Sequence, residues 1–155
     1  MITGEGGTGK SEVLHVLHQT IARLAHEQAV ITGAYTGSAA FLVSGQTLHS
    51  LFALPVSRVK GQPAQFVRLY GEKLADLQRF LGVGTRSARQ YLFIDEVSMV
   101  SNELLNWLSM RLQQCFQNTL PFGGMNVVCF GDFYQLAPIS EYSKRSVYVF
   151  DDLVG

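Results

Sequence analysis

Apolar residues recur along much of this 155-residue chain with the spacing of amphipathic helices. In residues 11–27, apolar side chains stand three and four positions apart, so this segment predicts a helix with one buried face. The same period occurs in residues 65–81 and 101–116, and the latter segment opens with Ser101, a common helix N-cap. Three amphipathic helices are therefore expected.

Short apolar runs without the helical period separate or follow these helices. They cover residues 29–35, 90–95 and 126–133, and they are rich in the β-branched and aromatic residues that suit buried strands. The first run is followed by small residues at 36–40, which we interpret as a loop. Strands that alternate with helices predict an α/β fold with a mainly parallel sheet flanked by helices, as one domain over residues 1–155.

The distribution of charge singles out one segment, although the net charge does not. With 12 basic and 12 acidic residues the formal net charge is zero, so composition alone indicates no polyanionic partner. More than half of the basic residues nevertheless lie close together: Arg58, Lys60, Arg68, Lys73, Arg79, Arg86 and Arg89. We interpret residues 55–90, approximately, as a small basic insertion that suits either a phosphate backbone or a solvated helix face.

Cysteine usage and the absence of targeting patterns indicate an intracellular protein without a membrane partner. Cys115 and Cys129 fit neither a metal knuckle nor a disulfide framework, and both lie in apolar runs, as reduced core thiols do. The sequence shows neither a leader pattern nor an apolar run of membrane-spanning length. Because only MIT precedes the first motif and the last apolar segment has barely begun, we expect a chain cut at both ends.

Residues 4–11, GEGGTGKS, match the phosphate-binding pattern G-x-x-x-x-G-K-[ST]. Glycines let successive N–H groups form a cup for oxyanions, and the following helix directs its N-terminus at the same phosphates. Lys10 supplies a mobile positive charge, and Ser11 offers a hydroxyl ligand to Mg²⁺. The alternative is that this segment is only a glycine-rich turn before a helix, without a ligand. The predicted nucleotide-binding residues are Gly4, Gly6, Gly7, Thr8, Gly9, Lys10 and Ser11.

Two further strand ends carry polar groups that a nucleotide hydrolase needs. Asp95 ends the run YLFID, where a carboxylate can hold Mg²⁺, and Glu96 follows as a candidate general base. Taken alone, this acidic pair could equally cap a helix. Gln135 follows the last apolar run, where its amide could report the γ-phosphate. We therefore take Lys10, Glu96 and Gln135 as the catalytic set, with ATP as substrate and Mg²⁺ as cofactor.

Four ordered segments, GEGGTGKS, TGSAAFLVSGQTLHSLF, LFIDEVSMV and PFGGMNVVCFGDFYQLAP, resemble the first motor domain of PIF-one-like DNA helicases of the RecD-like branch of superfamily one. The resemblance covers nearly the whole chain. It implies a RecA-like P-loop fold and an ATP-driven motor that moves 5′ to 3′ on single-stranded DNA and unwinds duplexes. It also associates the chain with DNA repair and recombination, and with the nucleus.

The resemblance also implies roles for individual residues. Asp95 would hold Mg²⁺, Glu96 would be the catalytic base, and Gln135 would couple the γ-phosphate to DNA. Contacts with the DNA strand are implied for Thr36, Gly37, Thr47 and His49. From the residues alone, His49 is an ordinary, partly buried histidine. The basic insertion falls where the family places its strand-separating wedge.

Three functions remain open on the sequence. The first is a helicase motor domain whose second domain, with the arginines that stabilise phosphoryl transfer, belongs to a longer chain. The second is a nucleotide-binding remnant without unwinding activity, because Arg111 and Arg145 are the only arginines after Asp95 and neither matches those positions. The third is a small-molecule kinase, which leaves the TGSAA and TLHS segments unexplained.

Overall fold

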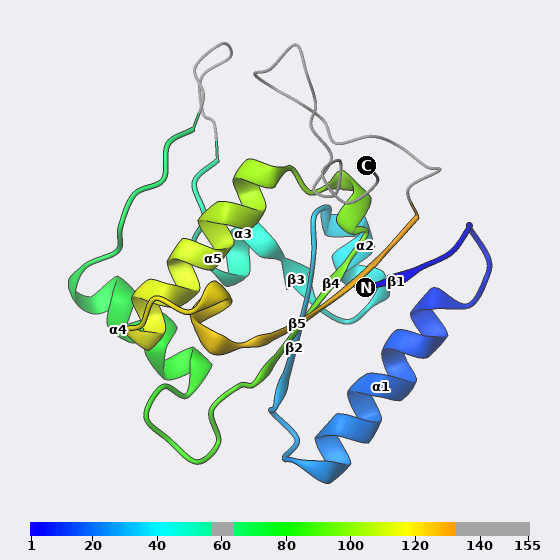
Figure 1. Ribbon diagram of the computed structural model, residues 1–155, viewed down its shortest axis with the longest axis horizontal. Coiled ribbons are helices and arrows are strands. Elements are labelled where there is room, and N and C mark those ends of the chain that lie inside the picture. The colour runs from blue at the N-terminus through cyan, green and yellow to red at the C-terminus, as the bar shows by residue number, and fades with distance from the viewer. Residues whose placement is uncertain (57–63, 133–155) are drawn as a thin grey trace.

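Figure 1 shows the computed structural model, which describes residues 1–56 and 64–132. Within these residues, parallel strands form one sheet in the order β1-β5-β4-β2-β3. The strands are β1 Ile2–Thr3, β2 Val30–Ala34, β3 Gln46–Thr47, β4 Tyr91–Asp95 and β5 Asn126–Gly131. The expected parallel sheet is confirmed, and each strand run foreseen in the sequence forms a strand.

Helices cover both faces of this sheet (Figure 1). They are α1 Lys10–Leu24, α2 Gly37–Leu42, α3 Leu48–Leu51, α4 Gly71–Leu81 and α5 Asn102–Phe116, with short 3₁₀ turns η1 Val97–Met99 and η2 Pro121–Gly124. Helix α1 packs on one face, whereas α3, α4 and α5 pack on the other. The predicted helices after the glycine loop and after Ser101 are confirmed, and the Ser101 hydroxyl accepts a hydrogen bond from Leu104 N at 3.2 Å.

Alternate residues of the strands feed two separate cores. On the α1 side, Phe93 and Phe130 pack with Leu14, and the two phenylalanine ring centroids are 5.5 Å apart. On the other side, Leu92 and Ile94 pack against α5. All five residues of β2 are buried, as expected of an inner strand covered on both faces. The sheet is therefore the middle of three layers.

Two predictions of local structure are wrong. Residues 36–40, read as a loop, lead into helix α2, which begins at Gly37 because Thr36 Oγ1 accepts from Ala39 N at 3.2 Å. Residues 65–70, read as helix, precede α4, which begins only at Gly71. There the main chain of Leu69 bonds to the side chain of Gln114, so a tertiary contact overrides the helical period.

In the part of the chain that the structure describes, no helix combines the length and apolar character needed to cross a bilayer. Cys115 and Cys129 are both free thiols, as predicted. Burial raises the pKa of Cys115 to about 11, although the charge of Arg111 opposes the shift. Such a thiol is inert at neutral pH, which fits a core role.

Candidate nucleotide and DNA site

The glycine loop connects β1 to α1 at the carboxyl edge of the sheet. Strand β1 pairs with β5 through Ile2–Phe130 and Thr3–Gly131, so the loop leaves a strand as the motif requires. Gly7 and Gly9 have φ of 78° and 86°, a conformation that L side chains rarely adopt. No atom lies within 4 Å of a Cβ built at either position, so space remains above the loop. The glycines therefore serve backbone conformation rather than packing.

Lys10 is held by the loop itself. Its Nζ donates to Gly4 O at 2.6 Å and to Glu5 O at 2.8 Å. Thr8 Oγ1 donates to the same Glu5 O at 2.8 Å, which tightens the turn. These two carbonyl oxygens accept from two of the three N–H donors of Lys10. Phosphate oxygens that bound Lys10 would therefore compete with them for its donors.

Asp95 and Glu96 lie at the carboxyl end of β4. Burial raises the pKa of Asp95, while a hydrogen bond from Glu96 N to Asp95 Oδ1 at 2.9 Å and the charges of Lys10 and His15 partly oppose this. Burial also raises the pKa of Glu96, and the Asp95 charge adds to the effect. Glu96 has φ 50° and ψ 44°, a left-handed backbone that turns the chain sharply before η1. A carboxylate with a raised pKa suits proton transfer near neutral pH.

Lys10 and Asp95 lie at the same edge of the sheet, because Lys10 follows the loop after β1 and Asp95 ends β4. The two residues are 85 positions apart in the chain: Lys10 is the first residue of α1, and Asp95 is the last residue of β4. Strands β1 and β4 are separated in the sheet only by β5. His15, one turn along α1 from Ser11, also acts on Asp95, and the sequence analysis did not single it out.

The residues at this edge fit a magnesium ion that also binds phosphates. The described residues contain no cluster of three or more His, Cys, Asp or Glu side chains that could hold a metal by themselves. Mg²⁺ usually keeps several waters and takes one or two protein ligands beside the phosphates of its nucleotide. Ser11, which is exposed, and the half-buried Asp95 provide that kind of donor set. The fit rests on the chemistry of the donors and on their common edge.

Gln135 lies outside the described residues, so its predicted role as γ-phosphate sensor stays a prediction. The described part of its segment ends with Gly131 and Asp132, at the end of the strand between β1 and β4. Asp132 is only 5% exposed. A Cβ at Gly131 would come within 2.9 Å of Val97 Cγ1, so β5 packs closely beneath the turn that follows Glu96.

The residues expected to contact DNA gather at the ends of β2 and β3. Thr36 and Thr47 follow or end these paired strands, and each caps a short helix: Thr36 Oγ1 caps α2, and Thr47 Oγ1 accepts from Ser50 N at 3.2 Å. Gly37 is exposed, and a Cβ there would meet no atom within 4 Å. His49 is half-buried, and its ring lies edge-on to Tyr35 at 5.9 Å. The structure thus gives both threonine hydroxyls a local structural role that the sequence did not reveal.

Several cations of the basic insertion are engaged within the protein. Arg89 donates to Phe80 O at 2.8 Å and to Gln28 O at 3.1 Å, and its guanidinium carbon lies 4.5 Å from the Phe80 ring centroid. Arg79 pairs with Asp76 on the surface of α4. Arg58 and Lys60 lie outside the described residues. The insertion is therefore less available to phosphates than its composition indicates.

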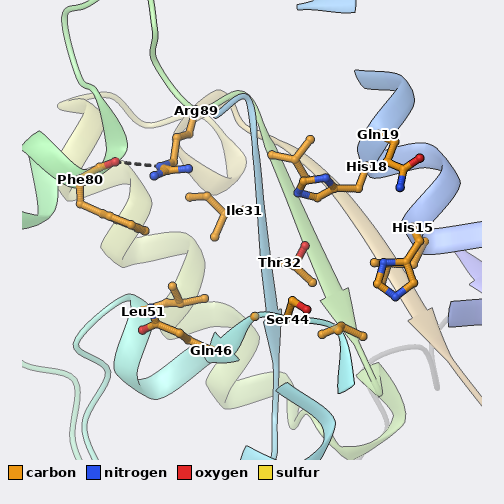
Figure 2. Close-up of a pocket in the computed structure, with 14 residues that line it drawn as sticks. His15, His18, Gln19, Ile31, Thr32, Ser44, Gln46, Leu51, Phe80 and Arg89 are labelled. Atoms are coloured by element: carbon orange, nitrogen blue, oxygen red, sulfur yellow. Dashed lines mark hydrogen bonds between the residues drawn. The ribbon is translucent and has the colours of Figure 1, made fainter. Parts of the chain in front are cut away.

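A hollow of about 440 Å³ lies beside β2, between α1 and the Phe80–Arg89 region (Figure 2). His15, His18 and Gln19 line it from α1, and Thr32 lines it from the strand. None of the glycine-loop residues, Asp95 or Glu96 lines it. It is therefore distinct from the predicted nucleotide site.

Comparison with known proteins agrees with this geometry. The PIF1-like helicase family matches residues 1–153. The chain is 32% identical over 149 residues to the ATP-dependent DNA helicase RRM3 of Saccharomyces cerevisiae. The aligned region covers 96% of this chain and 19% of that protein.

Solved structures of Pif1 helicases share the fold. One, described as the structural basis for DNA unwinding at forked dsDNA by two coordinating Pif1 helicases, superposes with a TM-score of 0.73 at 30% identity and covers 97% of this chain and 33% of that one. A Bacteroides Pif1 bound to ssDNA gives a TM-score of 0.71 at 30% identity and covers 97% of this chain and 32% of that one. The RecA-like fold is confirmed, and the chain spans about a third or less of the length of these relatives. With a family match over residues 1–153 and the glycine loop and acidic strand end on one edge, the chain belongs to the PIF1-like helicase family.

Proposed function

We propose that this chain is the first motor domain of an ATP-dependent DNA helicase, which couples ATP hydrolysis to 5′–3′ movement on single-stranded DNA and to duplex unwinding. The observation that carries the proposal is the arrangement of the sheet: β1, which leads into the glycine loop and Lys10, is separated only by β5 from β4, which ends in Asp95, and all three strands are parallel. A phosphate-binding lysine and a metal-binding carboxylate must converge in this way on one nucleotide.

In the proposed site, the N–H groups of the glycine loop and of the start of α1 bind the triphosphate. Lys10 leaves the carbonyl oxygens of Gly4 and Glu5 and binds the β- and γ-phosphates. Ser11 and Asp95 would hold Mg²⁺, and an ion bound there would supply positive charge beside the phosphates. Glu96 accepts a proton from the attacking water, and its raised pKa favours that transfer. Gln135 would sense the γ-phosphate.

On the DNA side, the ends of β2 and β3 face the strand. The support is positional: Thr47 pairs with Ala34, two residues before Thr36, and Ala34 pairs with Asp95 on its other side, so these residues share one sheet edge. Gly37 allows close approach of a sugar–phosphate backbone, and His49 adds a ring beside Tyr35. The similarity to the Bacteroides Pif1 bound to ssDNA supports single-stranded DNA as the partner class.

A complete cycle requires a second motor domain, because the arginines that stabilise phosphoryl transfer come from it in this family. This chain covers 19% of the yeast relative, which leaves room for such a domain elsewhere in a longer protein. The second candidate is a remnant that binds Mg–ATP but does not unwind DNA. By its family, we place the protein inside the cell and, in a eukaryote, in the nucleus, with DNA repair and recombination as the processes it serves.

Nucleotide binding and turnover separate these functions. Titration with a fluorescent ATP analogue, with Mg²⁺ and with EDTA, should show magnesium-dependent binding by the full chain. ATP hydrolysis should be slow and little changed by single-stranded DNA, because the arginines of a second domain are not supplied. Turnover strongly stimulated by DNA would favour a complete motor formed by self-association. A chain that binds no ATP analogue would exclude both the motor and the remnant.

A further inference from the structure

Arg111 is the largest fully buried side chain among the described residues, with 1% of its surface exposed. Within residues 1–56 and 64–132, no acidic side chain forms an ion pair with it. Burial lowers the pKa of the guanidinium, which nevertheless remains charged at neutral pH. A buried cation without a carboxylate is strongly unfavourable unless its donors are satisfied. Its partners therefore indicate why the chain keeps it there.

One pair of contacts fastens the end of α3. Arg111 Nε donates to Phe52 O at 3.1 Å, and Nη2 donates to Ala53 O at 3.2 Å. Phe52 is the C-cap of α3, and Ala53 has φ 47°, an unusual value for a residue with a side chain. The guanidinium thus caps α3 and holds the strained turn that ends it. This is the helix that carries His49, directly after Thr47.

The second set of contacts fastens residues 66–69, within the basic insertion. Arg111 Nη2 donates to Val67 O at 2.8 Å, and the guanidinium carbon lies 4.8 Å from the Phe66 ring centroid. Arg111 Nη1 donates to Gln114 Oε1 at 2.7 Å. Gln114 in turn donates to Leu69 O at 2.6 Å and accepts from Leu69 N at 3.2 Å. Arg111 and Gln114 of α5 therefore hold two segments of chain, residues 52–56 and 64–70, at one point. We call these segments the two limbs of the insertion, and Figure 1 shows them rising beside α5.

Helix α5 connects this point to the nucleotide edge. It begins at Asn102, shortly after Glu96, and the intervening Val97 and Val100 are fully buried in the same core as Leu104 and Leu108. A displacement of α5 relative to the sheet would therefore move α3 and the limb of residues 64–70 together. The contacts form one connected set from the acidic strand end to the predicted DNA side.

We propose that Arg111 is a positioning residue which, from helix α5, fixes both α3 and the limbs of the basic insertion so that they present one preformed surface to single-stranded DNA. The inference rests on the proposed function, since it assigns the DNA side of the same motor. Arginine suits the role because its planar fork reaches several carbonyl oxygens at fixed angles, which the compact ammonium of lysine does not.

The test compares Arg111→Met with Gln114→Leu in the full chain. Arg111→Met keeps an elongated apolar side chain but removes all the donors, whereas Gln114→Leu releases Leu69 and spares the α3 carbonyls. Hydrogen exchange should accelerate by about tenfold or more in peptides of residues 48–56 and 64–70 for Arg111→Met. In Gln114→Leu the acceleration should be confined to residues 64–70. Unchanged exchange in both segments of Arg111→Met overturns the inference, and it does so even if DNA affinity is altered.

The readout that a merely structural role would not move is the split between two affinities. Fluorescence anisotropy with a labelled oligothymidine should show about tenfold weaker binding by Arg111→Met, comparable to the loss of one or two base contacts. Affinity for a Mg²⁺-bound ATP analogue should not change. Arg111→Lys should not restore oligonucleotide affinity. Equal oligonucleotide affinity in the parent chain and Arg111→Met overturns the inference while leaving the proposed function in place.

Leu108→Ala is the matched control, because Leu108 is also fully buried on α5 but its side chain has no donor that could bond a carbonyl oxygen. It should lower thermal stability while leaving oligonucleotide affinity close to that of the parent chain. If Leu108→Ala lost as much oligonucleotide affinity as Arg111→Met, the loss in both variants would follow from lower stability of the fold. That result would overturn the inference. A parent chain that binds the ATP analogue but not the oligonucleotide overturns the proposed DNA function, and the inference with it.

Discussion

Lys10 and Arg111 are both bound by main-chain carbonyl oxygens, and they differ in how firmly they are held. Lys10 is partly exposed and donates to Gly4 O and Glu5 O within its own loop. Arg111 is fully buried and donates to carbonyl oxygens of two separate segments. A flexible ammonium near solvent exchanges its partners at little cost, whereas a desolvated guanidinium cannot. We therefore expect exchangeable contacts at Lys10, at the predicted nucleotide edge, and fixed contacts at Arg111, at the predicted DNA side.

Lys10→Ala should have the largest effect, because it removes the exchangeable cation of this comparison. Loss of the phosphate-binding charge should weaken affinity for a Mg²⁺-bound ATP analogue by about 100-fold or more. The melting temperature should change by no more than about 2 °C, because the exchanged bonds lie at the surface of a loop. Fluorescence titration and differential scanning fluorimetry measure the two effects. Unchanged nucleotide affinity would contradict the phosphate role of Lys10.

Glu96→Gln should separate chemistry from binding at the same edge. ATP hydrolysis should fall by roughly 10²- to 10⁴-fold, because the amide cannot accept the proton of the attacking water. Affinity for the ATP analogue should stay within about twofold of the parent value, since the residue is expected to act on water rather than on phosphates. Single-turnover hydrolysis and titration give both values. Loss of analogue binding in this variant would argue against the base assignment.

Arg111→Met should break the fixed side of the comparison. Carbonyl oxygens of Phe52, Ala53 and Val67 would lose their donors inside the protein, so the free energy of unfolding should drop by roughly 3 kcal/mol. Denaturant unfolding measures this loss. The control is Arg79→Met, whose side chain is 73% exposed and should alter stability by less than about 0.5 kcal/mol. Similar small effects from both substitutions would show that the buried contacts are not firm.

Gly131→Ala should sharpen the comparison by showing that the predicted nucleotide edge also has a tightly packed layer next to the turn after Glu96. The added methyl would lie 2.9 Å from Val97 Cγ1 and 3.3 Å from Ser98 N, so a loss of about 1 to 2 kcal/mol is expected. Gly37→Ala, where a Cβ meets no atom within 4 Å, should be neutral or slightly stabilising. Thermal unfolding of both variants provides the measurement, and equal losses would refute the packing argument.

The smallest expected effect concerns His18, about two turns along α1 from Lys10. Burial, and then the charge of His15, lower the pKa of His18. The folded protein therefore binds this proton less tightly than the unfolded chain, so stability is lost as pH falls from about 6.5, the ordinary histidine value, through the lowered one. His18→Gln should flatten this loss by well under about 1 kcal/mol, since the ring is partly exposed. Melting curves at several pH values between 7.5 and 5 would reveal it, and an unchanged slope would count against it.

The parts that could be predicted from the sequence are those governed by local chemistry. The glycine loop, Asp95 and Glu96 were identified because phosphate binding and metal binding demand those residue types at strand ends. The strands and α5 followed from period and from Ser101. The position of the glycine loop, Asp95 and Glu96 at one edge of the sheet follows from parallel strands that end there, whereas their roles in nucleotide binding and hydrolysis stay predictions.

The parts that could not be predicted depend on contacts between distant segments. Residues 65–70 have helical periodicity, yet Gln114, far along the chain, binds the Leu69 main chain and keeps them out of α4. Arg111 carried no local signal beyond an arginine on a helix, because its acceptors are carbonyl oxygens that any residue supplies. Likewise, the capping bonds of Thr36 and Thr47 depend on where two short helices begin.

The left-handed backbone at Glu96 has one further consequence. At φ 50° a side chain is disfavoured by roughly 1 kcal/mol relative to glycine, which adopts this conformation freely. Glycine would thus make a more stable hinge at this point, and the chain instead carries an acid there. Because the carboxylate of Glu96 is the candidate general base, folding and the proposed chemistry make opposite demands on this single position.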